Sequence, residues 1–157
     1  AAVKYLSPRL KRIFSWGAYI FSMILALIRD GDVCLTAEID GEEVKGSTII
    51  ITNVSRFGGP HVVAPDARVQ GDNLTVLVAL GLGRKNLIRY GLAFALGRVP
   101  ALPDIMVRNF KEVRVTAPTG YPIQIDGDGY GTVPVTFRLA PAKLKLLVPQ
   151  GYVETKK

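Results

Sequence analysis

The stretch Tyr-Pro-Ile-Gln-Ile-Asp-Gly-Asp, residues 121–128, carries the pattern that decides the fold. Apolar residues alternate with polar ones and lead directly into Asp126-Gly127. Asp-Gly supplies the two positive φ angles that a two-residue type I′ hairpin loop needs, and the alternation resumes at residues 133–139. The stretch therefore predicts a β-hairpin with a second carboxylate, Asp128, beside its turn. That carboxylate is either a candidate for chemistry or a solvated turn residue, as acids next to glycine commonly are.

The rest of the chain repeats this strand-and-turn pattern. Strands are predicted at residues 33–39, 48–52, 74–80, 112–116, 133–139 and 144–148. Thr48–Thr52 is a β-branched run typical of a strand covered on both faces, and Pro134 places its strand at a sheet edge or a bulge. Helices are predicted at Ile13–Ile28 and Arg84–Leu96. The expected fold is mainly β: a two-sheet β-sandwich with one or two accessory α-helices.

The length of the chain and its cysteine content limit the possible architectures. At 157 residues the chain suits a single domain, spanning 1–157, with a core of its own. Cys34 is the single cysteine, which excludes an internal disulfide framework and a multi-cysteine zinc site. A reducing cytoplasm is therefore the expected compartment.

The apolar segment Ile13–Ile28 is expected to be a helix packed along most of its circumference. It is 16 residues long and is interrupted by Ser15, Gly17 and Ser22, whereas a membrane-spanning helix needs about 20 apolar residues. Its basic lead-in resembles that of a signal peptide, but no small-residue cleavage site follows. Because the chain begins at Ala1 and enters this helix without an independent start, a processed or truncated polypeptide is expected.

Charge is unevenly distributed along the chain. The formal net charge is +7, with five basic and no acidic residues at positions 1–29 and six acidic and no basic residues at 30–43. A basic surplus suits an anionic partner such as a phospholipid surface or a nucleotide. No arginine run interleaved with aromatic residues occurs, so a nucleic-acid partner is not expected.

Familiar catalytic and metal-binding motifs fail on their spacing. The loop 126–131 begins like a calcium loop, but Tyr130 occupies the third ligand position and Phe137 stands where a bidentate Glu is needed. The stretch 81–86 lacks the spacing and the Ser or Thr of a phosphate-binding loop. His61 is the only histidine and has no nearby nucleophile, so a hydrolytic triad is not expected. The residues alone therefore contain no self-sufficient catalytic set.

What remains is an ordered set of short motifs. In chain order these are Asn53, Gly58-Gly59, Ala64–Ala67, Gly71–Leu74, Ile123–Asp128, Val135–Phe137 and Leu146–Pro149. This order resembles the C-terminal domain of the diacylglycerol kinase-like lipid kinases, the family of bacterial diacylglycerol and related lipid kinases and the sphingosine kinases. Family members similarly show an Asn, a Gly-Gly turn, an Ala-Pro-x-Ala stretch, an Asp-Gly-x-Leu segment, a strand that closes in Asp-Gly-Glu and a final strand that closes in Val-Pro. The resemblance covers nearly the whole chain, from Leu10 to Pro149.

The resemblance implies roles for particular residues. In the family, the acid that ends the Asp-Gly-Glu motif is the general base toward the lipid hydroxyl, and Asp128 stands at that position with a side chain one methylene shorter. The family's Asp-Gly-x-Leu segment contributes to a bound magnesium ion. Here Asp72 follows its glycine instead of preceding it, so it either swings into place as a metal ligand or forms a plain turn. Asn53, Gly58 and Gly59 match motif positions of the substrate cleft, where their simplest role is to shape a strand end and a turn.

The resemblance also implies a missing partner domain. In the family this β-sandwich packs against an N-terminal domain with a nucleotide-binding Gly-Gly-Asp-Gly-Thr motif, which does not occur here. The chain is therefore expected to be the C-terminal half of a two-domain lipid kinase, without its ATP-binding domain and inactive alone. ATP and Mg²⁺ are expected for the full-length enzyme, and no cofactor is firmly expected in this chain.

The expected partners follow from the same reasoning. They are the missing nucleotide-binding domain, a diacylglycerol-like lipid substrate and the surface of a membrane, with the protein in the cytoplasm or attached peripherally to that membrane. An alternative function is a stand-alone β-sandwich module that binds anionic lipid without catalysis. The apolar helix 13–28 is a further docking face, either for the missing domain or for a second copy in a homodimer.

Overall fold

The computed structural model describes residues 33–57, 61–141, 145 and 147. The expected helix at 13–28, most of the expected strand at 144–148, and Gly58 and Gly59 lie outside these residues. No helix in the described part of the chain is long and apolar enough to cross a membrane.

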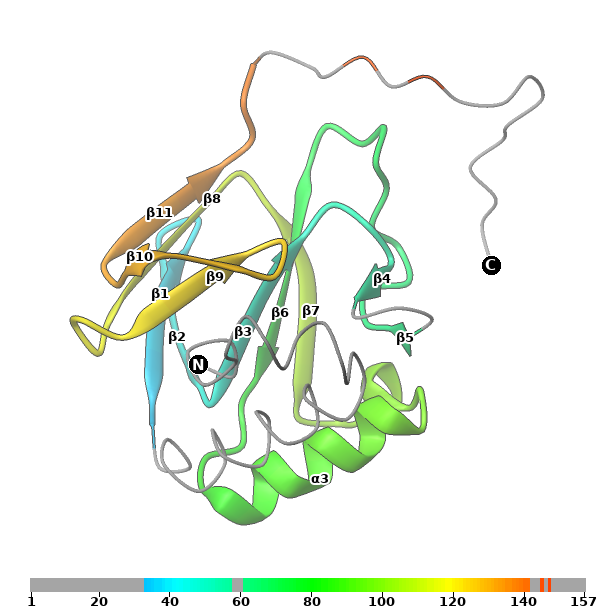
Figure 1. Cartoon of the computed structure of the whole chain (residues 1–157), viewed down its shortest axis with the longest axis vertical. Helices are drawn as coiled ribbons and strands as arrows, with labels where there is room; N and C mark the ends of the chain where they lie inside the picture. The colour runs from blue at the N-terminus through cyan, green and yellow to red at the C-terminus, as the bar shows by residue number, and fades with distance from the viewer. Residues whose placement is uncertain (1–32, 58–60, 142–144, 146, 148–157) are drawn as a thin grey trace, which may run out of the picture.

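Two antiparallel sheets form the body of the domain (Figure 1). The four-stranded sheet has the order β11-β8-β1-β2, made of Val135–Arg138, Glu112–Ala117, Leu35–Ile39 and Glu42–Gly46. The three-stranded sheet has the order β3-β6-β7, made of Thr48–Thr52, Leu74–Ala79 and Ile105–Phe110. Two further pairs are β9 and β10, at Pro122–Ile125 and Asp128–Thr132, and β4 and β5, at Arg56–Phe57 and His61–Val62. Among the described residues, the helices are α3, Arg84–Ala95, and the short 3₁₀ helix η2, Val99–Ala101. The expected two-sheet β-sandwich is confirmed.

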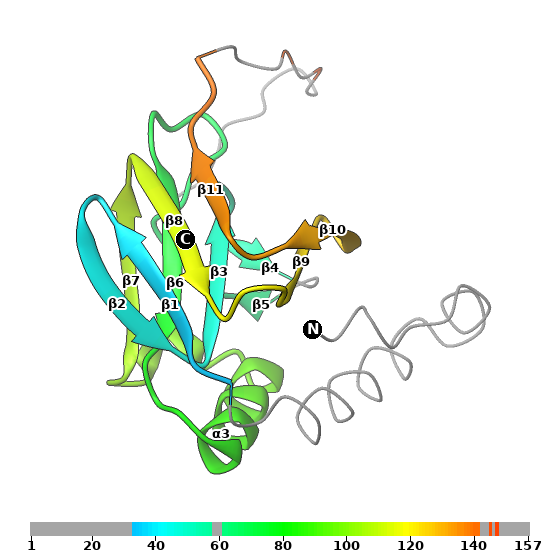
Figure 2. The same ribbon diagram turned by 90° about the vertical axis from the view of Figure 1, so that its left-hand side faces the viewer.

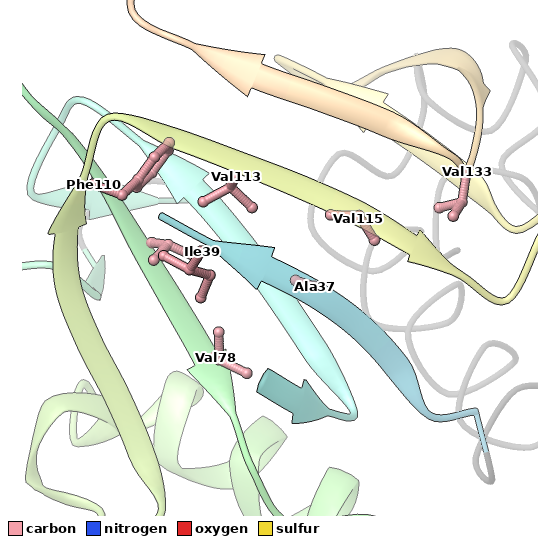
Figure 3. Close-up of a cluster of buried hydrophobic side chains, with 8 residues drawn as sticks. Ala37, Ile39, Val78, Phe110, Val113, Val115 and Val133 are labelled. Atoms are coloured by element: carbon pink, nitrogen blue, oxygen red, sulfur yellow. The ribbon is translucent and has the colours of Figure 1, made fainter. Parts of the chain in front are cut away.

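The first hydrophobic core lies between the two sheets (Figure 3). Ala37 pairs with Val115 and Ile39 with Val113, so the alternate apolar residues of β1 and β8 fall on one face of their sheet. They meet side chains of the three-stranded sheet and of the segment before β11, namely Val76, Val78, Phe110 and Val133. Because successive side chains of a strand point to opposite faces, the alternation in the sequence places the apolar side chains of β1 and β8 in this core.

The second core lies on the far side of the three-stranded sheet. Val76 and Val78 of β6 face the first core, whereas Leu77 between them packs into the second cluster with Val63 and with Ala93 of α3. In β3, the same division places Ile49 and Ile51 against the first core and Ile50 against the second. The three-stranded sheet is thus covered on both faces, as the β-branched run of β3 predicts.

Two hairpin turns match their sequence signals. Asp40 and Gly41, between β1 and β2, have φ angles of 49° and 89°. Asp126 and Gly127, between β9 and β10, have φ angles of 50° and 92°. Both turns place two successive residues at positive φ, which is the requirement of a type I′ turn.

Three features depart from the sequence expectations. Pro134 lies in the bend between β10 and β11, so its expected position within a strand is wrong, but the strand that follows it, β11, is at an edge of the four-stranded sheet as expected. The second strand of the Asp126-Gly127 hairpin is Asp128–Thr132, a segment without apolar alternation in which every residue is exposed. Strand β7 has no counterpart among the predicted strands, since Ile105–Val107 is a continuous apolar run of only three residues followed by Arg108 and Asn109.

Candidate functional site

Asp128 is carried by the β9–β10 hairpin. It is the first residue of β10 and pairs with Ile125 across the hairpin, directly beyond the Asp126-Gly127 turn. Its side chain is exposed, as is every residue of β10. Figure 2 shows the hairpin standing out beside the two sheets. The carboxylate is therefore accessible to a molecule that approaches this side of the domain.

The base of the hairpin is anchored in the first core. Val133 is only 2% exposed, and Tyr121 and Ile123 pack against the same cluster. The N–H of Val133 donates to the carbonyl of Tyr121 at 2.9 Å, and the N–H of Gly120 donates to the carbonyl of Val133 at 2.9 Å. These contacts fix the two ends of the hairpin, so that Asp128, which is exposed, is held at a set position.

Asn53 and Asp72 lie at the same end of the three-stranded sheet. Thr52, the last residue of β3, pairs with Thr75 near the start of β6, so the segments beyond both residues leave the sheet at the same end. Thr52 Oγ1 accepts a hydrogen bond from the N–H of Val54 at 3.0 Å and lies 3.0 Å from the Val54 carbonyl. This local turn redirects the chain at Asn53, and both Asn53 and Asp72 are exposed. The structure thus brings two of the predicted positions to the same end of the sheet, with Asp128 on a separate hairpin.

The residues around Asp72 do not make a complete magnesium site by themselves. Mg²⁺ is bound by oxygen ligands in an octahedral arrangement and is commonly held by one or two carboxylates together with substrate phosphates and water. Within residues 33–57, 61–141, 145 and 147, no group of three or more His, Cys, Asp or Glu side chains is positioned to hold a metal ion. Asp72 contributes a single carboxylate, so a magnesium ion there would need ligands from other molecules or domains.

A polar cluster that sequence reasoning missed joins α3 to the start of β7. The Tyr90 hydroxyl donates to Asp104 and accepts from the N–H of Gly81 at 2.8 Å, and Arg89 forms an ion pair with the same carboxylate. The Tyr90 hydrogen bond, followed by that of Arg89, lowers the pKa of Asp104, while burial and the neighbouring carboxylate raise the pKa of Tyr90. These shifts keep Asp104 ionised and Tyr90 protonated. The cluster is therefore better suited to holding α3 in place than to transferring protons.

Asp40 ties the β1–β2 turn to the connection between β7 and β8. Its carboxylate accepts hydrogen bonds from the main-chain N–H groups of Glu112 at 2.9 Å and Lys111 at 3.0 Å. The hydrogen bond from the Glu112 N–H makes the largest contribution to lowering the pKa of Asp40, and the bond from Lys111 adds to it. Burial acts in the opposite direction and raises the pKa, but the net effect is a lowered pKa. Sequence reasoning treated Asp40 only as a turn residue, because its partners lie about seventy residues away.

Over the described residues, these observations define a class of protein: a β-sandwich domain with a packed helix, an exposed acid on an anchored hairpin and no metal-binding cluster. The chain belongs to the family of YegS C-terminal NAD kinase β-sandwich-like domains, whose family model matches residues 1–148. The resemblance to the C-terminal domain of the diacylglycerol kinase-like family is thereby confirmed. A search of curated proteins gives no match.

Solved structures show the same fold at low sequence identity. One crystal structure of a "putative diacylglycerol kinase" from Bacillus anthracis str. Sterne is 14% identical, with a TM-score of 0.57 over 89% of this chain and 49% of that chain. A second structure so described, from the same organism, is also 14% identical, with a TM-score of 0.52 over 88% of this chain and 52% of that chain. The present chain thus spans about half the length of these proteins.

Proposed function

We propose that this chain is the lipid-substrate side of an ATP-dependent lipid kinase that phosphorylates the hydroxyl of a diacylglycerol-like lipid. The observation that carries the proposal is the position of Asp128, exposed on an anchored hairpin within the span of the family match. The structural relatives described as diacylglycerol kinases are about twice as long as this chain, which supports a second domain in the working enzyme. The nucleotide-binding site belongs to that domain, and the present chain is inactive alone.

Asp128 acts in this proposal as the general base. The lipid hydroxyl oxygen attacks the γ-phosphorus of ATP, the bond from that phosphorus to the β,γ-bridging oxygen breaks, and the hydroxyl proton passes to the Asp128 carboxylate. ATP provides the phosphoryl group, and a bound Mg²⁺, for which Asp72 would supply one carboxylate, would neutralise charge that develops on the phosphates. Asp128 must lie within hydrogen-bond reach of the hydroxyl, and an exposed residue on a hairpin fixed at its base meets that need. In this proposal Asn53 and Asp72, at one end of the three-stranded sheet, border the substrate cleft.

The proposal is tested by the kinase activity of the full-length enzyme with diacylglycerol as substrate. Asp128→Asn keeps the size of the side chain but removes the base, so kcat should fall about 10²–10⁴-fold. Asp126→Asn is the matched control, because it removes a carboxylate from the same hairpin and Asn tolerates the positive φ of 50° at that position. Equal rates for wild type and Asp128→Asn would remove Asp128 from the mechanism.

The net charge of +7 favours a second candidate, a module that binds anionic lipid without catalysis. Salt-sensitive sedimentation with anionic vesicles, with no kinase activity in the full-length product, would favour this candidate.

Light scattering over a range of concentrations tests the proposed homodimer in the same samples. Cell fractionation tests the proposed cytoplasmic or peripheral membrane location.

A further inference from the structure

Tyr130 is a large aromatic residue that lies exposed beside the proposed base. It is 65% exposed and follows Asp128 by two positions in β10. Asp128 pairs across the hairpin with Ile125, which is itself 40% exposed. Directly opposite residues of an antiparallel pair, and residues two apart in one strand, point to the same face of a sheet. The register therefore places Ile125, Asp128 and Tyr130 on one face of the hairpin.

A β-bulge determines how Tyr130 is presented. The register of β9 and β10 shifts between Gly129 and Thr132, so that Tyr130 and Gly131 together stand opposite the single residue Ile123. Gly131 has a φ angle of 69°, in the left-handed region that favours glycine. A bulge bends its strand and re-aims the side chains that it carries, and bulges are common beside active sites. The backbone of β10 thus presents Tyr130 at a bend next to the proposed base.

Packing within the domain does not explain Tyr130. A Cβ atom at either neighbouring glycine, Gly129 or Gly131, would meet nothing within 4 Å, so this part of the hairpin stands clear of other elements. Among the residues that the structure describes, no aromatic ring pairs with that of Tyr130. A tyrosine offers a broad apolar ring and a hydroxyl that can donate a hydrogen bond. Both features of Tyr130 are therefore open to a bound molecule.

We propose that Tyr130 is a specificity-determining residue whose hydroxyl donates a hydrogen bond to an ester carbonyl of the lipid substrate. In a diacylglycerol, a carbon next to the one that carries the free hydroxyl bears an ester, so a carbonyl oxygen lies close to that hydroxyl. Side chains two apart in a strand start about 7 Å from each other, which suits a lipid that presents its hydroxyl to Asp128 and its ester to Tyr130. The Tyr130 ring and Ile125 supply apolar surface for the acyl chain beyond the ester. This role rests on the proposed function, because Tyr130 acts on the lipid beside Asp128.

Binding of two short-chain lipids to the full-length enzyme tests this role. The probes are dihexanoylglycerol and its diether analogue dihexylglycerol, which have chains of the same length, although only the first has ester carbonyls. Tyr130→Phe removes the hydroxyl alone, so the preference for dihexanoylglycerol over dihexylglycerol, measured as the ratio of dissociation constants by calorimetry, should fall about fivefold. In the kinase assay Tyr130→Phe should raise KM for dihexanoylglycerol by about the same factor and leave kcat unchanged, because the hydrogen bond is made in the ground state as well as in the transition state.

The matched control removes a hydroxyl elsewhere. Thr136→Val changes an exposed residue of β11, outside the β9–β10 hairpin, so both dissociation constants should equal those of wild type. Tyr130→Ala removes the ring as well as the hydroxyl, so it should weaken binding of both lipids and abolish the same part of the preference. Circular dichroism verifies that each variant is folded.

Two results would overturn the role of Tyr130. The first is an unchanged preference in Tyr130→Phe. The second is an equal loss of binding of both lipids in Tyr130→Phe, because an effect that ignores the ester carbonyl does not come from a hydrogen bond to it.

Asp128→Asn separates this role from the proposed base. It should lower kcat while leaving the preference between the two lipids unchanged. Loss of the preference in Tyr130→Phe, with no effect of Asp128→Asn on kcat, would sustain Tyr130 as a lipid contact and reject Asp128 as the base. A wild-type enzyme that binds neither lipid would reject both proposals.

Discussion

Substitution of Gly46 by alanine should destabilise the domain strongly. Gly46 ends β2, where the chain leaves the four-stranded sheet and enters the three-stranded sheet through Ser47. A Cβ atom at this position would lie 2.5 Å from the carbonyl oxygen of Ala79 and 2.7 Å from Val78 Cγ1. A Cβ atom does not approach non-bonded atoms so closely. The Ala79 oxygen cannot easily move away, because it belongs to the backbone of β6, which is paired on both sides. The two sheets would therefore have to move apart.

The magnitude follows from the two contacts that must change. Overpacking a filled core costs about 1–3 kcal/mol. The N–H of Ser47 also donates to the Ala79 carbonyl at 2.8 Å, and losing this hydrogen bond costs about 1 kcal/mol more. The expected loss is about 2–4 kcal/mol, a large part of the roughly 5–15 kcal/mol by which a domain is usually stable.

Urea unfolding followed by circular dichroism measures this loss. Gly129→Ala is the matched control, because a Cβ there would meet nothing within 4 Å, and its free energy of unfolding should equal that of wild type or exceed it slightly. Equal unfolding midpoints for Gly46→Ala and Gly129→Ala, with unchanged denaturant dependence, would refute the argument that the sheets meet at Gly46.

Three further substitutions test the packing and the polar contacts. Tyr90→Phe should lower the free energy of unfolding by about 1–3 kcal/mol in the same urea assay, because the N–H of Gly81 loses its hydrogen-bond acceptor. Tyr130→Phe, at a 65% exposed position, is the control and should leave the free energy of unfolding unchanged. Leu77→Ala should cost about 2–5 kcal/mol, and a loss below 1 kcal/mol would contradict its burial between α3 and the sheet. Because the pKa of Asp40 is lower in the folded state than its unfolded value of 3.8, the ionised carboxylate stabilises the fold at pH values above 3.8, and this stability is lost as pH falls through the folded pKa. Asp40→Asn should therefore flatten the acid side of a plot of unfolding midpoint against pH. An unchanged acid side would show that the hydrogen bonds to the Asp40 carboxylate do not stabilise the fold.

Much of the local structure could be predicted from the sequence. The turns at Asp40-Gly41 and Asp126-Gly127 were predictable because the tolerance of Asp and Gly for positive φ belongs to the residues themselves. Strand alternation and the apolar spacing of Arg84–Ala95 were predictable for the same reason, since both periods follow from backbone geometry. The position of Asp128 directly beyond its turn was likewise readable, and its proposed role as a base rests on the family resemblance.

Other features were decided only by contacts between distant residues. Strand β10 has no apolar alternation, and it forms because the turn before it and the anchored Val133 after it hold it against β9. The register of Thr52 with Thr75 brings Asn53 and Asp72 to the same end of the sheet, although nothing within either segment specifies that register.

The sequence by itself therefore determined the kind of most main elements, although not of β7, together with the two-sheet class and the family, because periodicity, turn chemistry and motif order are properties of neighbouring residues. Only the tertiary structure decided the strand order, the contact at Gly46, the Tyr90–Asp104 cluster and the exposure of Ile88 and Leu92 on α3. Each of these depends on which surfaces pack together, and packing is settled by the combined burial and hydrogen bonding of residues far apart in the chain.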